Sequence, residues 1–412
     1  MYRDDEGVAA TDAHAPPQST ESFRLSATRG ASLVPAHPPP MLGGMPRLRA
    51  KLVTAGLALL AVPVLILLAE LVVRLFAPRI DPLSVFVASP QLVADTQGEH
   101  TRGMFEFDPL LTWRLRPGLR EMWWDYTPVT TNAAHVRMER ELGAKRGLRV
   151  VCVGDSVTFG YRVPVAHDRS KPGEFEAGER PYPALIESAL RAAFPGREIE
   201  VVPLACPGYS SKQGLEWLRR EIAALDPDMV TACFGWNDVR IAGPADRMTF
   251  PTGSAQATLR RFMAGSQLLL HVARSAQQRR AVEFTPEPRS SETEYTGNFM
   301  EMARLCSAHG AWFGIILPVY RDPNIPGDYP EGREDVADPG EGARMTRYRA
   351  QLAQNAAENN VPFIELAELT ERGWPANGGL FGERIHPNAA GHALMAERLL
   401  AWLKPVAAAR LK

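Results

Sequence analysis

Two stretches of this 412-residue chain carry side chains suited to acyl transfer. In VVCVGDSVTFG, a run of small and β-branched residues ends in Gly154, Asp155 and Ser156. A serine hydroxyl is a weak nucleophile until a neighbouring base removes its proton. His386, in GERIHPN, is a base suited to neutral pH, and Glu383 stands three residues before it. These residue types predict attack on a carbonyl carbon by Ser156, with His386 as the base.

Two further stretches supply hydrogen-bond donors for the negative charge that develops on the substrate oxygen. Gly208, in CPGYSS, offers a backbone N–H group, and Asn237, in GWND, offers a side-chain amide. Donors of these kinds form the oxyanion holes of acyl-transfer enzymes. A carboxylate that fixes the tautomer of His386 completes the set, and Glu383 is the candidate for that role.

The elements that must position these residues are predicted from apolar runs that alternate with amphipathic helical patterns. The runs that predict strands lie at residues 149–153, 199–205, 229–234, 312–319 and 362–366. Strands that are apolar on both faces are typical of a parallel sheet covered by helices on both sides. The sequence therefore predicts a three-layer α/β/α domain over residues 149–408. Ligands of such sheets bind beyond the carboxyl ends of the strands, which is where the candidate residues fall.

In chain order, the four stretches resemble the motif blocks of the SGNH (GDSL-type) hydrolase superfamily, here as a membrane-anchored bacterial-type member. The matching residues are Gly154-Asp155-Ser156, Gly208, Gly235-Trp236-Asn237-Asp238 and the pair Glu383 and His386. The resemblance covers about residues 150–395 and implies a flavodoxin-like fold with a five-stranded parallel sheet. It also implies an esterase without cofactor or metal.

The same resemblance assigns roles to individual residues. Ser156 is the expected nucleophile and His386 the expected base, with an oxyanion hole formed by Ser156, Gly208 and Asn237. One position departs from the family pattern, because the acid is usually Asp and the chain has Glu383 there. The longer Glu side chain reaches the imidazole only if the backbone stands further back.

Simpler roles remain open for several of these residues. Ser156 follows a strand and is a candidate N-cap for the next helix. Asn237 is a candidate partner of a loop backbone, and His386 a packed loop residue. Asp155 is expected to form hydrogen bonds within its own turn. His392 falls at the start of the last predicted helix, where we expect a capping or surface position.

Near the N-terminus, residues 52–69 carry no charge. An α-helix of this length reaches about the thickness of a membrane hydrocarbon core. We expect a membrane anchor over residues 47–78; a signal peptide and a buried helix are the alternatives. Basic residues on the N-terminal side of the run favour a cytoplasmic N-terminus and an extracytoplasmic catalytic domain, periplasmic or at the cell surface. They are Arg47, Arg49 and Lys51, against Arg74 and Arg79 after the run.

The other segments have distinct compositions. Residues 1–46 are rich in Pro, Ala, Ser and Gly and are predicted to be disordered. Residues 79–148 are aromatic and rich in turn residues, and we expect a few strands there that pack on the catalytic domain. Long segments near 240–297 and 320–343 interrupt the α/β rhythm and are predicted to be inserts.

Charge and cysteine content exclude some classes of function. The formal net charge is −1 and no basic block stands out, which argues against a nucleic-acid partner. The four cysteines show no zinc-type spacing. Cys152 and Cys233 lie in predicted strands, where they are expected as core residues. A disulfide remains open if the domain lies in an oxidising compartment.

The sequence therefore predicts a serine esterase acting on an ester substrate. The family resemblance and the expected location outside the cytoplasm imply a small acyl group, such as acetyl on a glycan or another acylated envelope polymer. One alternative is an O-acyltransferase that passes the same acyl group to a sugar hydroxyl. The other is a non-catalytic envelope-binding protein on the same scaffold. The presence of Ser156, Asn237 and His386 together favours an enzyme, because a binding protein has no need of all three.

Overall fold

The computed structural model describes residues 45–87, 103–124, 127–163, 179–241, 243–251, 253–279, 287–319, 340–371, 379–381 and 385–412. The chain divides into two units, Met1–Val64 and Leu65–Lys412, of which the second contains the α/β domain. Residues 1–44 of the predicted tail and most of the predicted insert over 320–343 lie outside the described residues, whereas Met45 and Pro46 begin a helix.

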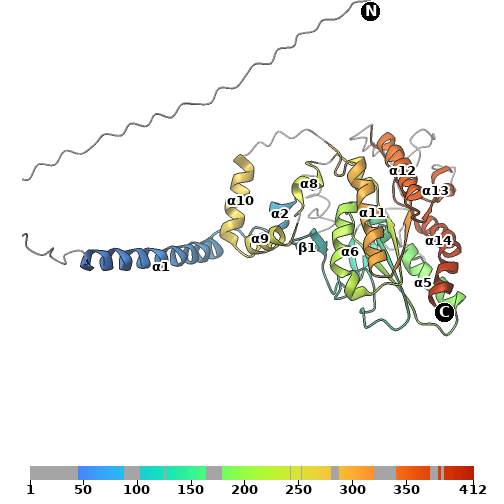
Figure 1. Cartoon of the computed structure of the whole chain (residues 1–412), viewed down its shortest axis with the longest axis horizontal. Helices are drawn as coiled ribbons and strands as arrows, with labels where there is room; N and C mark the ends of the chain where they lie inside the picture. The colour runs from blue at the N-terminus through green and yellow to red at the C-terminus, as the bar shows by residue number, and fades with distance from the viewer. Residues whose placement is uncertain are drawn as a thin grey trace, which may run out of the picture. The chain divides into compact units, whose positions relative to one another are not determined.

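A five-stranded parallel sheet forms the centre of the second unit (Figure 1). Its order is β6-β5-β7-β8-β9, which is the flavodoxin-like order, since β5 is the first of these strands along the chain. The strands are β5 (Leu148–Gly154), β6 (Ile199–Ala205), β7 (Met229–Cys233), β8 (Trp312–Ile316) and β9 (Phe363–Ile364). Each overlaps one of the five runs predicted from the sequence, so the predicted five-stranded parallel sheet is confirmed.

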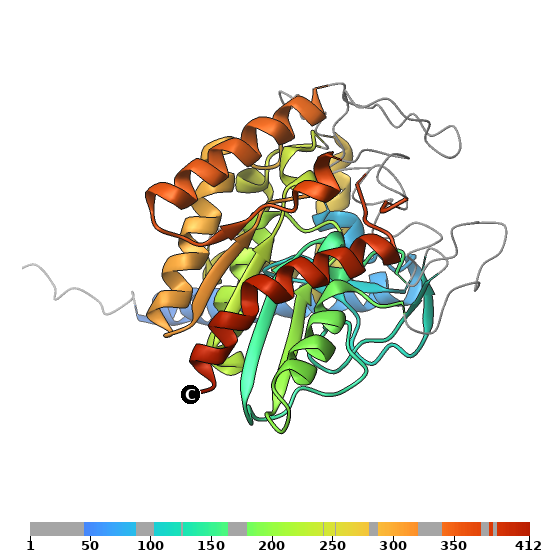
Figure 2. The same ribbon diagram turned by 90° about the vertical axis from the view of Figure 1, so that its right-hand side faces the viewer.

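Helices cover both faces of this sheet, as Figure 2 shows. One face packs against α5 (Tyr182–Ala193) and α14 (Ala389–Arg410). The other packs against α6 (Ser211–Leu225), α11 (Glu292–Ala308) and α12 (Glu341–Glu358). The three-layer α/β/α arrangement is therefore confirmed.

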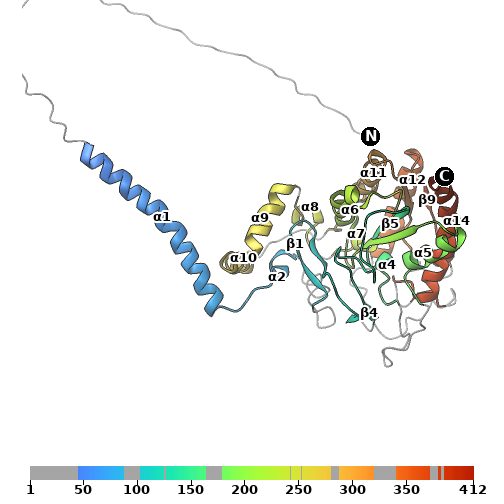
Figure 3. The same cartoon turned by 90° about the horizontal axis from the view of Figure 1, so that it is seen from below.

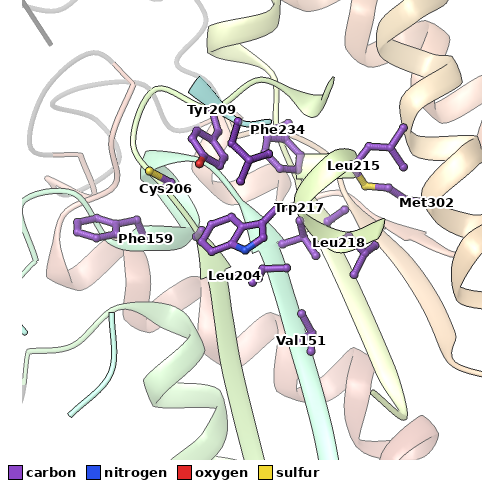
Figure 4. Close-up of a cluster of buried hydrophobic side chains, with 14 of the residues drawn as sticks. Val151, Phe159, Leu204, Cys206, Tyr209, Leu215, Trp217, Leu218, Phe234 and Met302 are labelled. Carbon is purple, nitrogen blue, oxygen red and sulfur yellow. The ribbon is translucent and has the colours of Figure 1, made fainter. Parts of the chain in front are cut away.

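The alternation of side chains along β5 explains why two separate cores form. Val150 and Cys152 point to the core with α5 and α14, whereas Val151 and Val153 point to the other. All seven residues of β5 are buried, as expected of a central parallel strand. Figure 4 shows part of the second core, where Val151 of β5 lies near Trp217 and Leu218 of α6.

Register at the sheet's carboxyl edge places three loops side by side. Gly154, the last residue of β5, pairs with Ala205 of β6 and with Cys233 of β7. The loops after these strands therefore begin at the same level. The short helices α4 (Ser156–Phe159) and α7 (Trp236–Val239) follow β5 and β7 directly.

The segment before the sheet forms two antiparallel hairpins, in β1 (Phe105–Asp108) with β2 (Thr112–Leu115) and in β3 (Met122–Trp124) with β4 (Thr127–Val129). Their buried side chains, including Trp113 and Trp124, belong to the same core as α6 and α11. A short helix, α2 (Leu83–Phe86), contacts both β2 and α10 (Gln267–Arg279), and Figure 3 shows it between β1 and α10.

In the described part of the segment between α7 and α11 there are three further helices. They are α8 (Asp246–Thr249), α9 (Ser254–Ala264) and α10, and α9 packs against α10. Helix α13 (Ala367–Glu371) follows β9.

Helix α1 (Met45–Phe76) crosses from the first unit into the second. Within the described residues, Lys51–Phe76 is the part of the chain that is long and apolar enough to cross a membrane. The structure brings all four cysteines into the interior as separate thiols, with no disulfide among them.

Candidate active site

Ser156 lies at the first position of α4, directly beyond the carboxyl end of β5. It is not the N-cap of this helix. Asp155 takes that position, and its carboxylate accepts a hydrogen bond of 2.9 Å from the backbone N–H of Val157. This is the local role that the sequence suggested for Asp155. The Ser156 hydroxyl is thus left for a partner outside its own turn.

That partner is His386. The Oγ of Ser156 and the Nε2 of His386 lie 2.7 Å apart, although 230 residues separate them in the sequence. The imidazole is half-buried, and the ring of Tyr161 packs against it with 4.5 Å between the ring centroids. Tyr161 in turn contacts Trp124 of the β3–β4 hairpin. The structure therefore unites the two residues for which the sequence predicted nucleophile and base.

Gly208 lies in the loop after β6 with φ of 80°, a left-handed conformation that favours glycine. A Cβ atom there would meet the Trp113 ring at 3.3 Å. The indole Nε1 of Trp113 donates a hydrogen bond of 3.1 Å to the carbonyl of Pro207. The loop is therefore held from the side by a residue of β2.

Asn237 lies on α7, after β7, and is 8% exposed, while Ser156 is 9% exposed. The Nδ2 atom of Asn237 donates a hydrogen bond of 3.0 Å to the carbonyl of Tyr209. This contact joins the loop after β7 to the Gly208 loop. It also shows that Asn237 does bind loop backbone, which the sequence left open. An Asn amide has two hydrogens on Nδ2, so this bond does not exhaust its capacity as a donor.

Arg289 is a residue of this region that the sequence did not reveal. It is 1% exposed, and its Nη1 donates a hydrogen bond of 2.6 Å to the carbonyl of Gly208. Its other donors reach Asp246, at 2.9 Å from Nε, and Gln213, at 2.7 Å from Nη2. Asp246 also accepts a hydrogen bond from the hydroxyl of Ser210. The guanidinium therefore joins the start of α6, the Gly208 loop and the two ends of the segment with α9 and α10.

No local pattern marks Arg289 as important in the sequence. It is one arginine in a polar stretch, and its partners lie 43 to 81 residues away along the chain. The nearest signal is the capping box of Ser291 and Glu294, which predicts the start of α11 but gives no role to the preceding arginine.

Two buried carboxyl groups lie behind the loops. Burial raises the pKa of Asp155 to about 7, an effect that the N–H of Val157 and the nearby His386 partly oppose. Burial likewise raises the pKa of Asp238 to about 6, against hydrogen bonds from Ser211 and Ser290. The Asp238 carboxylate accepts 2.6 Å and 2.8 Å bonds from these two hydroxyls, and it fixes the first turn of α6 to the start of α11.

Two further predicted positions have different outcomes. Glu383 lies outside the described residues, so its role stays a prediction. The expectation for His392 is wrong, because this residue is fully buried rather than at a cap or the surface. Its Nδ1 accepts a hydrogen bond of 3.1 Å from the backbone N–H of Tyr182, and burial lowers its pKa to about 3. Asn388 caps α14 instead.

The described ranges contain no group of three or more His, Cys, Asp or Glu residues arranged to hold a metal ion. Among the described residues, the Ser156 region brings together a hydroxyl and an imidazole at the carboxyl edge of a parallel sheet. These are the groups of acyl-transfer chemistry, and they define a serine hydrolase on an α/β/α scaffold.

Comparison with known families agrees with this class. The GDSL-like Lipase/Acylhydrolase family matches residues 152–394, which is more than half of the chain and includes Ser156, Gly208, Asn237 and His386. The chain therefore belongs to this family and is an SGNH (GDSL-type) serine hydrolase, as the sequence motifs predicted. No curated protein matches the chain.

Several solved structures are similar to this chain. An α/β hydrolase from the Lake Arreo metagenome has 22% identity and a TM-score of 0.39, covering 65% of this chain and 97% of its own. A lipase/acylhydrolase from Enterococcus faecalis has 17% identity and a TM-score of 0.38, and the match covers 63% of this chain and 96% of its own. An acetylxylan esterase from Geobacillus stearothermophilus has 21% identity and a TM-score of 0.39, and the match covers 64% of this chain and 95% of its own.

Proposed function

We propose that this protein is an esterase that attacks a carboxylic ester with Ser156 and forms an acyl-enzyme. The observation that carries the proposal is the 2.7 Å separation between Ser156 Oγ and His386 Nε2. As Oγ bonds to the carbonyl carbon, His386 accepts the hydroxyl proton, and it then delivers this proton to the leaving alcohol. Water attacks the acyl-enzyme with the same imidazole as base, which releases the acid and restores the serine.

The negative charge of each tetrahedral intermediate is assigned to three donors. They are the backbone N–H groups of Ser156 and Gly208 and the second Nδ2 hydrogen of Asn237. The alignment of β5, β6 and β7 at their carboxyl ends supports this assignment, since the three loops start at one level. The hydrogen bond from Asn237 to the Tyr209 carbonyl supports it further, because it holds the amide beside the Gly208 loop.

Glu383 is proposed as the acid that orients His386. Its support is its place three residues before the histidine, where the family usually has Asp. A carboxylate there fixes the tautomer in which Nε2 accepts the serine proton, and stabilises the imidazolium formed on attack.

The acyl group is proposed to be small, such as acetyl on a glycan or envelope polymer. The low exposure of Ser156 and Asn237, at 9% and 8%, supports a small group better than a long chain. Rates of the full-length protein with p-nitrophenyl esters of increasing acyl length test this directly. We expect kcat/KM to be highest for acetyl and to fall with each lengthening. A maximum at long acyl chains would contradict the small-acyl proposal.

The nucleophile is tested with a fluorophosphonate probe. We expect Ser156→Ala to abolish both labelling and hydrolysis of p-nitrophenyl acetate, because no other atom takes the place of Oγ. Ser188→Ala, on the exposed side of α5, is the matched control and should retain both. Labelling that persists in Ser156→Ala would place the nucleophile elsewhere.

We also propose that α1 anchors the protein in a membrane as a single pass, with a cytoplasmic N-terminus and an extracytoplasmic catalytic domain. The basic residues before the apolar run support this orientation. The end of α1 also forms hydrogen bonds with the folded domain, from Arg74 to the Gly265 carbonyl and from Gln267 to the Glu70 carboxylate. A helix whose C-terminal end is bound to the folded domain fits a retained anchor better than a cleaved signal. We expect the full-length chain to stay with membranes through carbonate extraction; release would contradict the anchor.

A further inference from the structure

Helix α9 has an apolar surface that its own domain leaves uncovered. None of its 11 residues is buried, although the helix belongs to the folded unit. Leu259 is 58% exposed and Phe262 is 69% exposed, and residues three apart lie on the same side of a helix. Large apolar side chains that gather on an exposed helix indicate a binding surface.

Helix α10 carries one further exposed large apolar residue. Its inner side is fixed by Leu270, which is fully buried against Ile80 and Val85. Val272, two residues further on, points about 200° away from Leu270 around the helix and is 59% exposed. Val272 therefore lies on the outer side of α10, together with the exposed residues Arg274, Ser275, Ala276 and Gln277. We call Leu259, Phe262 and Val272 the hairpin surface.

The turn between α9 and α10 is bound to the end of α1. The Glu70 carboxylate accepts hydrogen bonds from the backbone N–H groups of Gln267, at 2.9 Å, and Leu268, at 2.8 Å. It also accepts a 2.7 Å bond from the hydroxyl of Ser266. A carboxylate at the N-terminus of α10 satisfies N–H groups that the helix itself leaves unpaired.

A second contact strengthens this junction. Arg74 donates a hydrogen bond of 2.7 Å to the carbonyl of Gly265, and it pairs with Glu70 on the same helix. Gly265 is only three residues beyond Phe262. The hairpin surface is thus fixed close to the point where the chain leaves the proposed membrane span.

The charge of the hairpin is complementary to an anionic surface. Residues 254–277 contain Arg260, Arg261 and Arg274 and no Asp or Glu. Arg260 is engaged within the domain, with a 2.8 Å bond to the carbonyl of Thr249. Arg261 and Arg274 are exposed. Basic helices with an exposed apolar side bind at the headgroup level of anionic bilayers.

We propose that α9 and α10 dock on the bilayer that α1 spans, with the hairpin surface in the headgroup layer and Arg261 and Arg274 on anionic phospholipid. The proposal rests on the proposed membrane anchoring, but not on the esterase activity. If the hairpin docks in this way, the position of the active site relative to the membrane is fixed as well. Asp246 precedes α9 in the chain and Arg289 follows α10, and the two residues form an ion pair. Arg289 also donates a hydrogen bond to the carbonyl of Gly208.

The test uses the full-length chain in nanodiscs that hold one chain each, made of equal parts phosphatidylcholine and phosphatidylglycerol. Because the four native thiols are buried, an environment-sensitive fluorophore attaches at an introduced cysteine. Phe262→Cys reports on the hairpin surface, and Leu60→Cys on α1 reports on the bilayer. Arg304→Cys, on the exposed side of α11, reports on water. We expect blue-shifted emission at position 262, between the values at positions 60 and 304.

The outcomes separate the hairpin from the anchor. Water-like emission at position 262 with bilayer-like emission at position 60 would overturn the docking of the hairpin and leave the anchor standing. Water-like emission at both would overturn the two proposals together. Hydrolysis of p-nitrophenyl acetate by the same labelled chains reports on the active site independently.

The anionic partner is tested by charge removal. We expect Arg261→Gln combined with Arg274→Gln to reduce the blue shift at position 262, and nanodiscs of phosphatidylcholine alone to reduce it similarly. Arg304→Gln combined with Arg398→Gln, on α11 and α14, removes the same charge elsewhere and should leave the shift unchanged. An equal shift in all of these conditions would show that anionic lipid is not the partner.

Discussion

The oxyanion side and the base side of the Ser156 site are supported by different kinds of contact. The Gly208 loop is held by a hydrogen bond from the buried Arg289. The first residue of the adjacent α6, Ser211, donates a hydrogen bond to the buried Asp238. His386 lies instead in the connection that precedes α14. That connection forms a β-bridge between Phe381 and Pro387, and the imidazole rests against Tyr161. Among the described residues, the Gly208 loop is therefore held by a buried charged group in addition to Trp113, whereas the ring contact of His386 is with Tyr161.

The difference matches what each side does in the proposed reaction. Oxyanion donors stabilise charge best when they already point at its position, because no reorganisation is then needed during attack. A base must instead accept a proton from one oxygen and deliver it to another. We therefore expect changes on the oxyanion side to reduce kcat in proportion to the donor lost, and changes on the base side to act through removal or reorientation of the imidazole.

The largest expected effect is on the base side. His386→Ala removes the imidazole that takes the serine proton, and kcat for p-nitrophenyl acetate should fall by about 10⁴–10⁶. His309→Ala, at the exposed end of α11, is the matched control and should leave kcat unchanged. An unchanged kcat in His386→Ala would show that another residue is the base, and the contrast between the oxyanion side and the base side would no longer hold.

The next effect is on the oxyanion side. Asn237→Ala should lower kcat by about 10²–10³, equivalent to about 2.7–4 kcal/mol, which is the usual loss for one oxyanion donor. KM should change much less, since the donor acts on charge that develops in the transition state. Asn359→Ala, in an exposed position after α12, is the control. If KM alone rises, Asn237 binds substrate rather than the oxyanion.

Glu383→Ala sharpens the comparison on the base side. We expect kcat to fall by about 10–10³, less than for His386→Ala, because the imidazole is retained and only its orientation and charge balance suffer. Glu383→Asp tests the fit of the longer side chain: a gain in kcat indicates the usual family geometry, and a loss indicates a backbone adjusted to Glu. Glu397→Ala, on the exposed face of α14, is the control.

One result would show that the base side works without an acid. If kcat/KM of Glu383→Ala equals that of the parent while His386→Ala is inactive, the enzyme works with a serine–histidine pair, and the aromatic contact with Tyr161 gains importance in holding the ring.

The smallest expected effect concerns Arg289, a positioning residue on the oxyanion side. Arg289→Lys keeps the positive charge beside Asp246 but loses the fork that reaches Gly208 and Gln213 together. We expect kcat to fall about tenfold, the loss of roughly one hydrogen bond from a charged donor, with KM nearly unchanged. Arg247→Lys, an exposed arginine paired with Glu287, is the control. Equal changes in kcat and KM, or a lower Tm alone, would indicate a structural role.

Much of the fold was predictable because its signals are local. The five apolar runs predict the strands, and the helical patterns between them predict the layers. The residues Ser156, Gly208 and Asn237 were found because each follows a strand, and parallel strands end at one edge. No local pattern links Ser156 to His386, since 230 residues separate them; the chemistry of the two residue types suggested the pairing, and the family resemblance assigned their roles.

The parts that sequence reasoning missed depend on contacts between distant segments. Arg289 gains its role from Gly208 and Asp246, and neither contact leaves a periodic pattern in the chain. The error at His392 has the same origin. A first-turn position of a helix is usually exposed or capping, but α14 packs against α5 there, and the N–H of Tyr182 supplies a partner for the imidazole.

The buried thiols have a practical consequence for the folding of this protein. Burial raises the pKa of Cys152 and of Cys306 to about 12, so neither forms a reactive thiolate near neutral pH. Cys152 lies in the middle of β5 and Cys306 on α11, on opposite faces of the sheet. An alkylating reagent therefore reaches each thiol only when its own layer opens. The alkylation rate of each thiol therefore reports how often its own layer opens. Equal rates would mean that both layers open in one cooperative event.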